Sequence, residues 1–417
     1  MSEQLRRELG LAGATIVGLG SILGTGVFVS LGIAAGITGP SVVLAVAMAA
    51  VVATANGLSS AQLAAAYPVS GGTYEYGYRL LHPAAGFAAG WMFLLAKSAS
   101  AATAALGFSG YALTLLRPSA SPQLSLLVAL GTVILLTLIV AAGIRRTTVV
   151  NSVIVGITLF SLAAFILISV PFIDPSRFLP FFQPEEGRTA SGALFYAAAL
   201  SFVAYTGYGR IATLGEEVRA VVATLLMTML IYVFVAAGGV GILGSRGMAV
   251  MTEQTGAPLE VAAGSVIGRP GRLILAVGAI TATVGVILNL ILGLSRVLLA
   301  MGRRGDMPLF LGRLRNNTPL PAVLTMGAVI AGIVLVGDIR LTWSFSAVTV
   351  LVYYAITNAA ALALPSESRR FPRGIALFGL LGCLTLALFV DPEVLLTAAG
   401  VLIIGFLWFF IRKSSRS

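Results

Sequence analysis

The sequence predicts an all-α membrane protein with twelve membrane-spanning helices. Hydrophobic residues occupy 58% of the 417 positions and charged residues only 10%, which is typical of a polytopic membrane protein and not of a soluble one. A helix needs about 20 apolar residues to cross a bilayer. Segments of that kind lie at residues 11–36, 40–66, 84–116, 124–143, 149–171, 191–215, 221–244, 273–300, 319–337, 341–364, 374–390 and 393–411. The stretches between them are too short to fold alone, so residues 1–417 are predicted to form a single membrane domain.

The first segment carries a cluster of small and hydroxylated residues at its centre. Charged residues precede it and no small-residue cleavage site follows, so it is not expected to be a removable signal peptide. Gly20, Gly24 and Gly26 alternate with Ser21 and Thr25. Lipid offers no hydrogen bonds, so a helix loosened at its centre is tolerated only where its backbone meets protein, water or a bound solute. Glycines also permit close helix packing, but this cluster favours a binding site.

The third segment contains a lysine in its apolar interior. Lys97 lies about four turns into the helix if the helix begins near Pro83. A charge at the bilayer centre is costly and usually faces a cavity or a partner. Burial favours the neutral amine, so Lys97 could exchange a proton near neutral pH. The alternative is a permanently charged residue bonded to carbonyls or to Ser98 and Ser100.

The sixth segment shows a second interruption, at residues 202–210, where Thr206 and Gly207 precede Arg210. Two interruptions five spans apart are typical of the LeuT-type inverted repeat, in which each half gives one discontinuous helix to a central site. The predicted repeats are residues 9–171 and 190–365, followed by two additional helices in 373–412. Seven residues separate Arg210 from Glu217, so the two are expected to form a gate-like ion pair near the cytoplasmic end.

The cations are distributed unevenly over the two sides of the predicted bundle. The net charge is +11, which could suggest nucleic acid as a partner, but the pattern instead indicates topology. One side holds residues 6, 7, 79, 145, 146, 219, 296, 303, 304, 313, 315, 369, 370, 373, 412, 413 and 416, whereas the other holds only residues 117, 177, 188, 246, 269, 272 and 340. By the positive-inside rule the first side is cytoplasmic. Both termini are therefore predicted to be cytoplasmic, and the segments at 174–188 and 244–272 to be external.

Four stretches resemble the amino acid–polyamine–organocation transporters. They are residues 20–28, residues 67–91 with the sequence YPVSGGTY, residues 204–218 ending in GEEV, and residues 295–319. The sixth-span stretch is most similar to the cationic amino acid transporter branch. The resemblance implies the LeuT-type core of ten helices plus two, and secondary transport of amino acids that is often coupled to protons. The chain departs from many relatives at Gln62 and Gly209, where they carry acids, and at Thr158, where some carry a lysine.

The resemblance and the two interrupted helices together suggest a substrate site. The amino acid's carboxylate is expected on the backbone N–H groups of Gly24, Thr25 and Gly26, because the amino-terminal ends of half-helices favour anions. Its amino group is expected near carbonyls at Ile22, Val203 and Thr206, and Gly207 is also expected to contribute to the substrate site.

Substrate and coupling ion are less well defined by the sequence. The interior cations favour neutral amino acids, with acidic ones possible, although the sixth-span resemblance points to cationic ones. Proton coupling through Lys97 is the first expectation. Sodium coupling, with an oxygen site at Gly20, Leu23 and Thr283, or exchange transport are the alternatives.

Other functional classes fit the sequence less well. An intramembrane enzyme would need paired acids, a Ser/His or Ser/Lys arrangement or a metal set, and Lys97 with a serine is the only possible dyad. A channel or receptor would need a repeated filter or a signalling domain. The expected protein is therefore a permease of the cytoplasmic membrane, in contact with lipid, with no cofactor, no metal and no nucleic acid partner.

Overall fold

The computed structural model describes residues 11–68, 71–117, 120–143, 148–208, 218–315 and 317–414. The regular elements of these ranges are all helices, apart from one isolated bridge between Arg315 and Thr318. The α-helices of the first half are α1 (Leu11–Ile22), α2 (Leu31–Thr38), α3 (Val42–Ala66), α4 (Thr73–Leu80), α5 (Pro83–Leu116), α6 (Pro122–Ala141), α7 (Thr148–Ser169) and α8 (Ala190–Tyr205). Those of the second half are α10 (Val218–Thr255), α11 (Pro258–Ile267), α12 (Arg269–Arg304), α13 (Leu320–Val334), α14 (Ile339–Leu362), α15 (Arg373–Leu388) and α16 (Pro392–Ser414). A π-helix, η1 (Gly26–Ser30), and the 3-10 helices η2 (Gly39–Ser41), η3 (Val170–Phe172), η4 (Pro175–Phe178), η5 (Thr206–Tyr208), η6 (Leu309–Gly312) and η7 (Ser366–Ser368) complete the fold.

A helix, or a run of consecutive helices, lies at each of the twelve apolar segments. Among the described residues, nine helical stretches are long and apolar enough to cross a membrane. One of them, Gly26–Ala66, covers part of the first predicted segment and all of the second. The shorter apolar helices α13 and α15 lie at two more of the predicted segments. The all-helical membrane fold is thus as predicted, while the count of twelve crossings stays a prediction.

The predicted external segment at 244–272 is largely helical. Helix α10 continues to Thr255 past Gly244, whose backbone (φ 73°, ψ 162°) is non-helical. A positive φ is readily adopted only by glycine, so the helix resumes in a new direction at this position. Gly256 and Gly268, also at positive φ, then separate α10, α11 and α12.

Several helix starts follow from capping side chains. The hydroxyls of Ser121 and Thr189 accept hydrogen bonds from backbone N–H groups in the first turns of α6 and α8. The carboxylate of Asp338 accepts one from Leu341 at the start of α14. Such caps satisfy N–H groups that have no partner within the helix, and Pro122 suits the first position of α6 because its missing N–H is not needed there.

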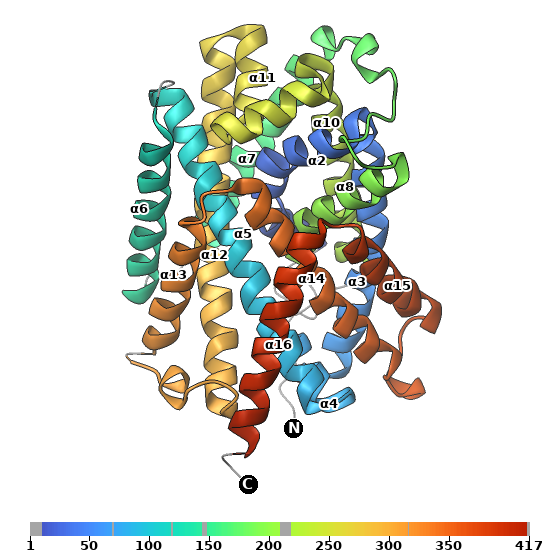
Figure 1. The fold of residues 1–417 in the computed structure, drawn as a ribbon, viewed down its shortest axis with the longest axis vertical. Coiled ribbons are helices and arrows are strands. Elements are labelled where there is room, and N and C mark those ends of the chain that lie inside the picture. Colours follow the sequence, from blue (N-terminus) through green and yellow to red (C-terminus); the bar gives the residue numbers. More distant parts are fainter. Residues whose placement is uncertain are drawn as a thin grey trace.

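Helix α5 runs through the middle of the molecule, where it packs against α12 and α14 (Figure 1). Its central residues are mostly alanine, serine and glycine and are buried. Hydroxyl pairs join it to α14, at 2.7 Å between Ser100 and Ser346 and at 2.9 Å between Thr103 and Thr342. Small residues let helix backbones approach closely, and hydroxyls hydrogen-bond across the contact. This composition makes α5 a closely packed central helix against which the other helices are positioned.

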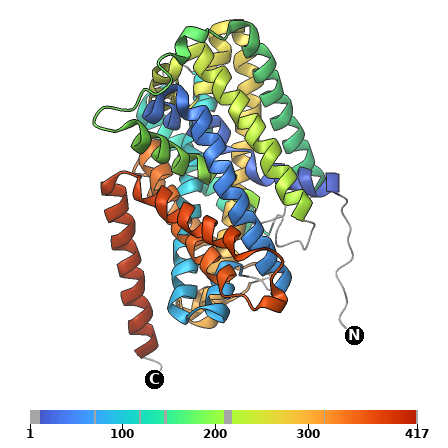
Figure 2. The same ribbon diagram turned by 90° about the vertical axis from the view of Figure 1, so that its right-hand side faces the viewer.

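The edges of the bundle present large apolar side chains to their surroundings. Helix α16 stands at the margin of the molecule (Figure 2), and Leu396, Ile404 and Leu407 on it are 73%, 60% and 58% exposed. Leu127 on α6 and Phe160 on α7 are similarly exposed, at 65% and 68%. An apolar surface of this extent belongs in a membrane and not in water.

Candidate functional site

The first predicted interruption is present in the structure. Helix α1 ends at Ile22, Leu23 and Gly24 are not helical, and the chain resumes as the π-helix η1. The Gly24 carbonyl accepts backbone hydrogen bonds from Val27 at 3.1 Å and from Phe28 at 3.3 Å. A mid-membrane break of this kind needs partners outside its own helix.

The sixth segment also loses its α-helical form at the predicted position. Helix α8 ends at Tyr205, and η5 begins at Thr206. The Thr206 hydroxyl donates to the Val203 carbonyl at 2.7 Å, and the Thr206 carbonyl accepts from the Tyr354 hydroxyl at 3.3 Å. The expected ion pair of Arg210 with Glu217 lies outside the described residues.

The two interruptions lie directly against each other. A Cβ atom placed on Gly207 would be 2.1 Å from the Ser21 carbonyl oxygen, and one placed on Gly26 would be 2.3 Å from Ala204 Cβ. Only glycine allows this approach at both positions. The hydroxyl of Tyr232 on α10 lies 3.1 Å from the Ile22 carbonyl oxygen and 3.3 Å from that of Ala204, so it bridges both breaks.

A cavity of about 640 Å³ adjoins the paired interruptions. This volume is within the usual range of small-molecule sites, about 300–1,000 Å³. Six of the seven residues predicted to bind substrate line it: Ile22, Thr25, Gly26, Val203, Thr206 and Gly207. Gly24 is not among the lining residues and packs instead against Val286, whose Cγ2 atom would be 2.4 Å from an added Cβ. The hydroxyl of Thr25 is buried and has no hydrogen-bond partner within the described part of the chain.

Lys97 lies in the same cavity, on its α5 wall. Its Nζ atom donates a hydrogen bond to the Thr206 hydroxyl oxygen at 2.6 Å, and the residue is only 8% exposed. Within the described ranges no carboxylate lies at ion-pair distance from it. A cation without a counterion thus faces the space between the interrupted helices.

The other predicted ion site is placed differently. Thr283 on α12 is fully buried. Its hydroxyl donates to carbonyl oxygens of its own helix, at 2.7 Å to Ala279 and at 3.1 Å to Ile280. Thr283 is not among the residues that line the cavity, whereas Gly20 is.

The cavity extends from the interruptions toward α4 and the carboxyl end of α12. Thr73, Tyr74 and Tyr76 of α4 line this part, with Arg296 of α12. Sequence reasoning did not identify Asn289 and Tyr353, which also line the cavity. A single polar or aromatic residue within an apolar helix does not indicate, from the sequence alone, that it faces a cavity.

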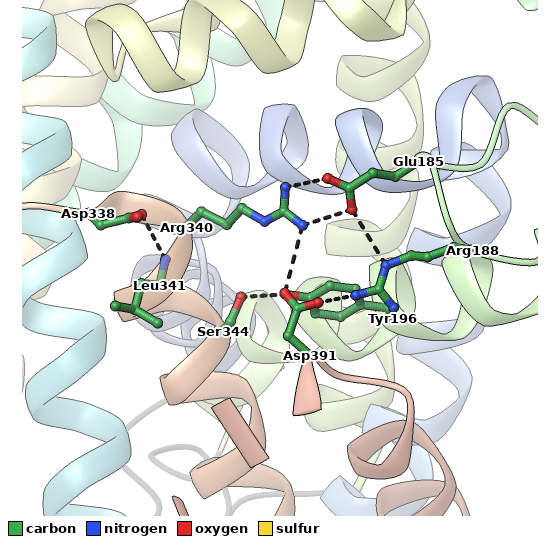
Figure 3. A network of polar contacts seen from close by, with 8 residues as sticks. All are labelled: Glu185, Arg188, Tyr196, Asp338, Arg340, Leu341, Ser344 and Asp391. Atoms are coloured by element: carbon green, nitrogen blue, oxygen red, sulfur yellow. Dashed lines mark hydrogen bonds and ion pairs between the residues drawn. The ribbon is translucent and has the colours of Figure 1, made fainter. Parts of the chain in front are cut away.

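A network of charged side chains joins the loop before α8, the start of α14 and the residue before α16 (Figure 3). The Arg340 guanidinium at the start of α14 donates two hydrogen bonds to the Glu185 carboxylate, at 2.6 and 2.8 Å. Arg188 pairs with Asp391, which also accepts a hydrogen bond of 2.6 Å from the Tyr196 hydroxyl on α8. None of these residues is among those that line the cavity.

The network fastens one loop to several helices at once. The Glu185 backbone N–H donates to the Ile37 carbonyl in α2 at 2.8 Å. Its carboxylate is held by Arg340, whose charge-assisted hydrogen bonds lower the pKa of Glu185 below the ordinary value of 4.5. The loop before α8 is therefore tied to both α2 and α14.

The chain is similar to known transporters over nearly its whole length. The family model described as amino acid permease matches residues 9–412. An uncharacterized transporter of Mycobacterium tuberculosis is 38% identical, over 99% of this chain and 92% of its own length. The branched-chain amino acid permease of Bacillus subtilis is 26% identical over 99% of this chain and 95% of its own length, and the methylthioribose transporter of the same organism is 27% identical over 80% and 75%. This chain therefore belongs to the amino acid permease family and is a multi-pass membrane transporter, not an enzyme.

Proposed function

We propose that this protein is a secondary active transporter of neutral amino acids across the cytoplasmic membrane, that it works by alternating access, and that it is coupled to protons. The observation that carries the proposal is the cavity at the two interrupted helices, with Lys97 on its wall. Two discontinuous helices that meet near the centre are the arrangement in which transporters of the inverted-repeat type hold substrate. Residues 9–171 and 190–365 are the proposed repeats.

The substrate's carboxylate is assigned to the start of η1. The amino-terminal end of a helix carries free N–H groups and partial positive charge, which attract anions. Thr25 and Gly26 line the cavity, so their amides are the principal donors. The amide of Gly24 is a secondary donor, because that residue packs against Val286.

The ammonium group is assigned to the carbonyls of Ile22, Val203 and Thr206. The Ile22 and Thr206 oxygens each accept one hydrogen bond, from Tyr232 and Tyr354. A carbonyl oxygen has two lone pairs, so each of these two can accept a further hydrogen bond from an ammonium group. The Val203 oxygen accepts two, from the hydroxyl and the backbone N–H of Thr206, so it can bind the ammonium group only in exchange for one of them.

The charges of the cavity favour a neutral side chain. Its described lining contains Lys97 and Arg296 and no aspartate or glutamate. A cationic substrate side chain would meet like charge and no counterion, which is unfavourable in a site of low dielectric constant. The branched-chain amino acid permease among the relatives supports the same substrate class.

The conformation is assigned as open to the cytoplasm. The cavity extends toward α4 and the carboxyl end of α12, which is the end with most of the arginines and is cytoplasmic by the positive-inside rule. The network of Glu185, Arg188, Arg340 and Asp391 then closes the external side.

Lys97 is the proposed coupling residue. Its amine is bonded to Thr206, at the interruption that must rearrange when the site changes sides. Loss of its proton would remove a charged anchor from that interruption, which links protonation to conformation. Sodium coupling through Gly20, Leu23 and Thr283 is the alternative, and it would leave Lys97 permanently charged.

Transport in proteoliposomes tests the proposal. Purified protein is reconstituted, a pH gradient or a sodium gradient is imposed, and uptake of labelled leucine, valine, arginine and glutamate is followed. A pH gradient is expected to drive accumulation of leucine and valine. Accumulation driven only by sodium, selectivity for arginine or glutamate, or no transport of any amino acid would contradict the proposal.

A further inference from the structure

Helix α11 covers the end of the molecule opposite α4 (Figure 1). It begins with Pro258 at its first position and ends before Gly268. It packs against α10, α12, α7 and the π-helix η1. The end of α10, just before α11, also packs closely against α5, since a Cβ atom on Gly110 would lie 2.2 Å from the Thr255 carbonyl oxygen. Helix α11 is therefore seated on the elements that surround the interrupted first span.

Glu260, in the first turn of α11, is buried without any hydrogen-bond partner. The residue is 0% exposed, and among the residues that the structure describes neither of its carboxyl oxygens has a hydrogen-bond partner. An acid near a helix start interacts favourably with the helix dipole, but this interaction does not replace the lost hydration of an ionised carboxylate. Burying such a charge unpaired is very costly, and the group becomes neutral instead.

The ionisable groups that act on Glu260 are few. The charge of Glu260 interacts with Tyr111 on α5 and with the cation Arg272 on α12, whose side chain lies over Gly264. Elements α2, α7 and η1 carry no ionisable side chain, and Arg246 and Glu253 on α10 are exposed. Burial raises the pKa of Glu260 to about 8, and the charge of Arg272 opposes that shift only in part.

Tyr111 connects Glu260 to the interrupted first span. Its hydroxyl donates a hydrogen bond of 2.7 Å to the Phe28 carbonyl in η1 and also interacts with the backbone of Leu259, the residue before Glu260. The same tyrosine therefore contacts both η1 and the residue next to Glu260, so a movement of α11 away from η1 would also change the surroundings of Glu260.

We propose that Glu260 is a proton-binding site that must take up a proton from the external solution before α11 can close on η1. The proposal rests on the alternating-access function given above. When α11 is lifted, water hydrates the carboxylate and it titrates as an ordinary glutamate. When α11 closes, the carboxylate is desolvated and gains a proton, and reopening returns that proton to the same side. Glu260 thus sets how external pH controls closure, whereas Lys97 couples transport to the gradient.

The direction of the pH dependence follows from the two states. An ordinary glutamate has a pKa of 4.5, and buried Glu260 has a pKa of about 8. Below 4.5 both states are protonated, and closure is at its most favourable. Between these values closure consumes one proton, so the closed-to-open ratio falls about tenfold for each unit of rising pH. Above about 8 the closed state must hold an unpaired carboxylate and is disfavoured in full.

Infrared difference spectroscopy of the full chain in lipid tests proton binding without relying on transport. The carbonyl band of a protonated buried carboxylic acid should titrate with a midpoint near pH 8. It should be absent in Glu260→Gln and unchanged in Glu253→Gln, an exposed acid at the end of α10. Arg272→Gln should move the midpoint to higher pH, because it removes the cation whose charge lowers the pKa of Glu260. A band that persists in Glu260→Gln, or a midpoint that Arg272→Gln leaves unchanged, would overturn the proposal.

Exchange of labelled substrate, measured with equal pH on both sides of the proteoliposome, tests the consequence for closure. Exchange by the native protein and by Glu253→Gln should fall as pH rises toward 8 and level off above it. Exchange by Glu260→Gln, which mimics the protonated acid, should not fall. The same decline in Glu260→Gln would refute the role in closure. Absence of amino acid exchange in every variant would instead refute the proposed transport function, and the infrared titration would still decide whether Glu260 binds a proton.

Discussion

The side-chain nitrogen of Lys97 lies 2.6 Å from the hydroxyl oxygen of Thr206. The two residues are 109 positions apart in the sequence, one in the rigid central helix α5 and the other at the point where α8 ends. The Thr206 hydroxyl in turn donates a hydrogen bond of 2.7 Å to the Val203 carbonyl. A change of charge on Lys97 therefore acts on the interruption itself.

Replacing Lys97 by methionine should uncouple transport from the pH gradient. Lys97→Met keeps the length of the side chain and removes its proton site, so the accumulation ratio is expected to fall to the value measured without a gradient. Exchange of substrate should continue, because the backbone carboxylate site is unchanged. Accumulation by Lys97→Met at the native level would contradict the coupling role.

Lys97→Arg separates coupling from a purely structural charge. Arginine stays protonated at any physiological pH, so the coupling role predicts that this variant also fails to accumulate substrate. A structural charge predicts that arginine restores accumulation. Loss of both accumulation and exchange in folded Lys97→Met would indicate that Lys97 contacts the substrate's carboxylate.

Gly26→Leu should abolish uptake. A Cβ atom at this position would lie 2.3 Å from Ala204 Cβ and 2.8 Å from Ala204 Cα, so the two interrupted helices must separate. Overpacking of this kind costs about 1–3 kcal/mol, which is small enough that folded protein is expected in the membrane. Gly131→Leu is the matched control, because nothing lies within 4 Å of a Cβ atom there. Uptake by Gly26→Leu at the level of Gly131→Leu would show that the contact is not needed.

The sequence predicted the interruptions because their signals are local. The clustered glycines around Gly24 and the pair Thr206 and Gly207 lie within single apolar segments, where backbone breaks need special residues. Lys97 was identifiable for a similar reason, since a charge within an apolar helix stands out.

The other features of the site could not be predicted, because they depend on contacts between residues that are far apart in the sequence. Tyr232 bridges the two interruptions from α10, yet a tyrosine in an apolar helix is unremarkable in sequence. Glu260 lies in a segment predicted to be an external loop, and only the packing of α11 buries it. The pairing of Arg340 with Glu185 joins residues 155 positions apart.

The predicted topology can be tested with single cysteines. In a Cys383→Ala background, which removes the chain's one cysteine, Ser414→Cys at the end of α16 should be labelled by an impermeant maleimide only after the cells are opened. Ser176→Cys, in the predicted external loop, should be labelled on intact cells. Labelling of Ser414→Cys on intact cells would invert the assignment of sides, including that of the cavity mouth.

Breaking the pair of Arg340 and Glu185 should open the external side. Their side chains are each 31% exposed, so we expect a loss of about 1–2 kcal/mol, or a 5- to 30-fold rise in the open population. The reporter is Ala347→Cys in the Cys383→Ala background, since Ala347 is fully buried on α14 one turn beyond Ser344. Arg340→Gln should increase its labelling from outside.

Arg177→Gln is the control for that experiment. Arg177 pairs with Asp174 in the same loop, and both side chains are exposed, at 39% and 49%. That pair ties no helices together, so labelling of Ala347→Cys should not change. Equal labelling in Arg340→Gln and Arg177→Gln would show that the network does not hold the external side closed.

The two acids at the external end should give closure opposite responses to pH. Arg340 holds the pKa of Glu185 below 4.5, so the stabilisation from this pair is present above the ordinary value and is lost as pH falls through the lower, folded value. Glu260 has the reverse sign, because its raised pKa of about 8 makes closure weaken as pH rises. Labelling of Ala347→Cys should therefore be lowest near pH 4.5, rising below that value as Glu185 gains a proton, and rising also between pH 4.5 and about 8, above which it levels off. Glu185→Gln should remove the acidic rise and leave the alkaline one, whereas Glu260→Gln should do the opposite. A single rise that both variants alter in the same way would contradict the separate roles of the two acids.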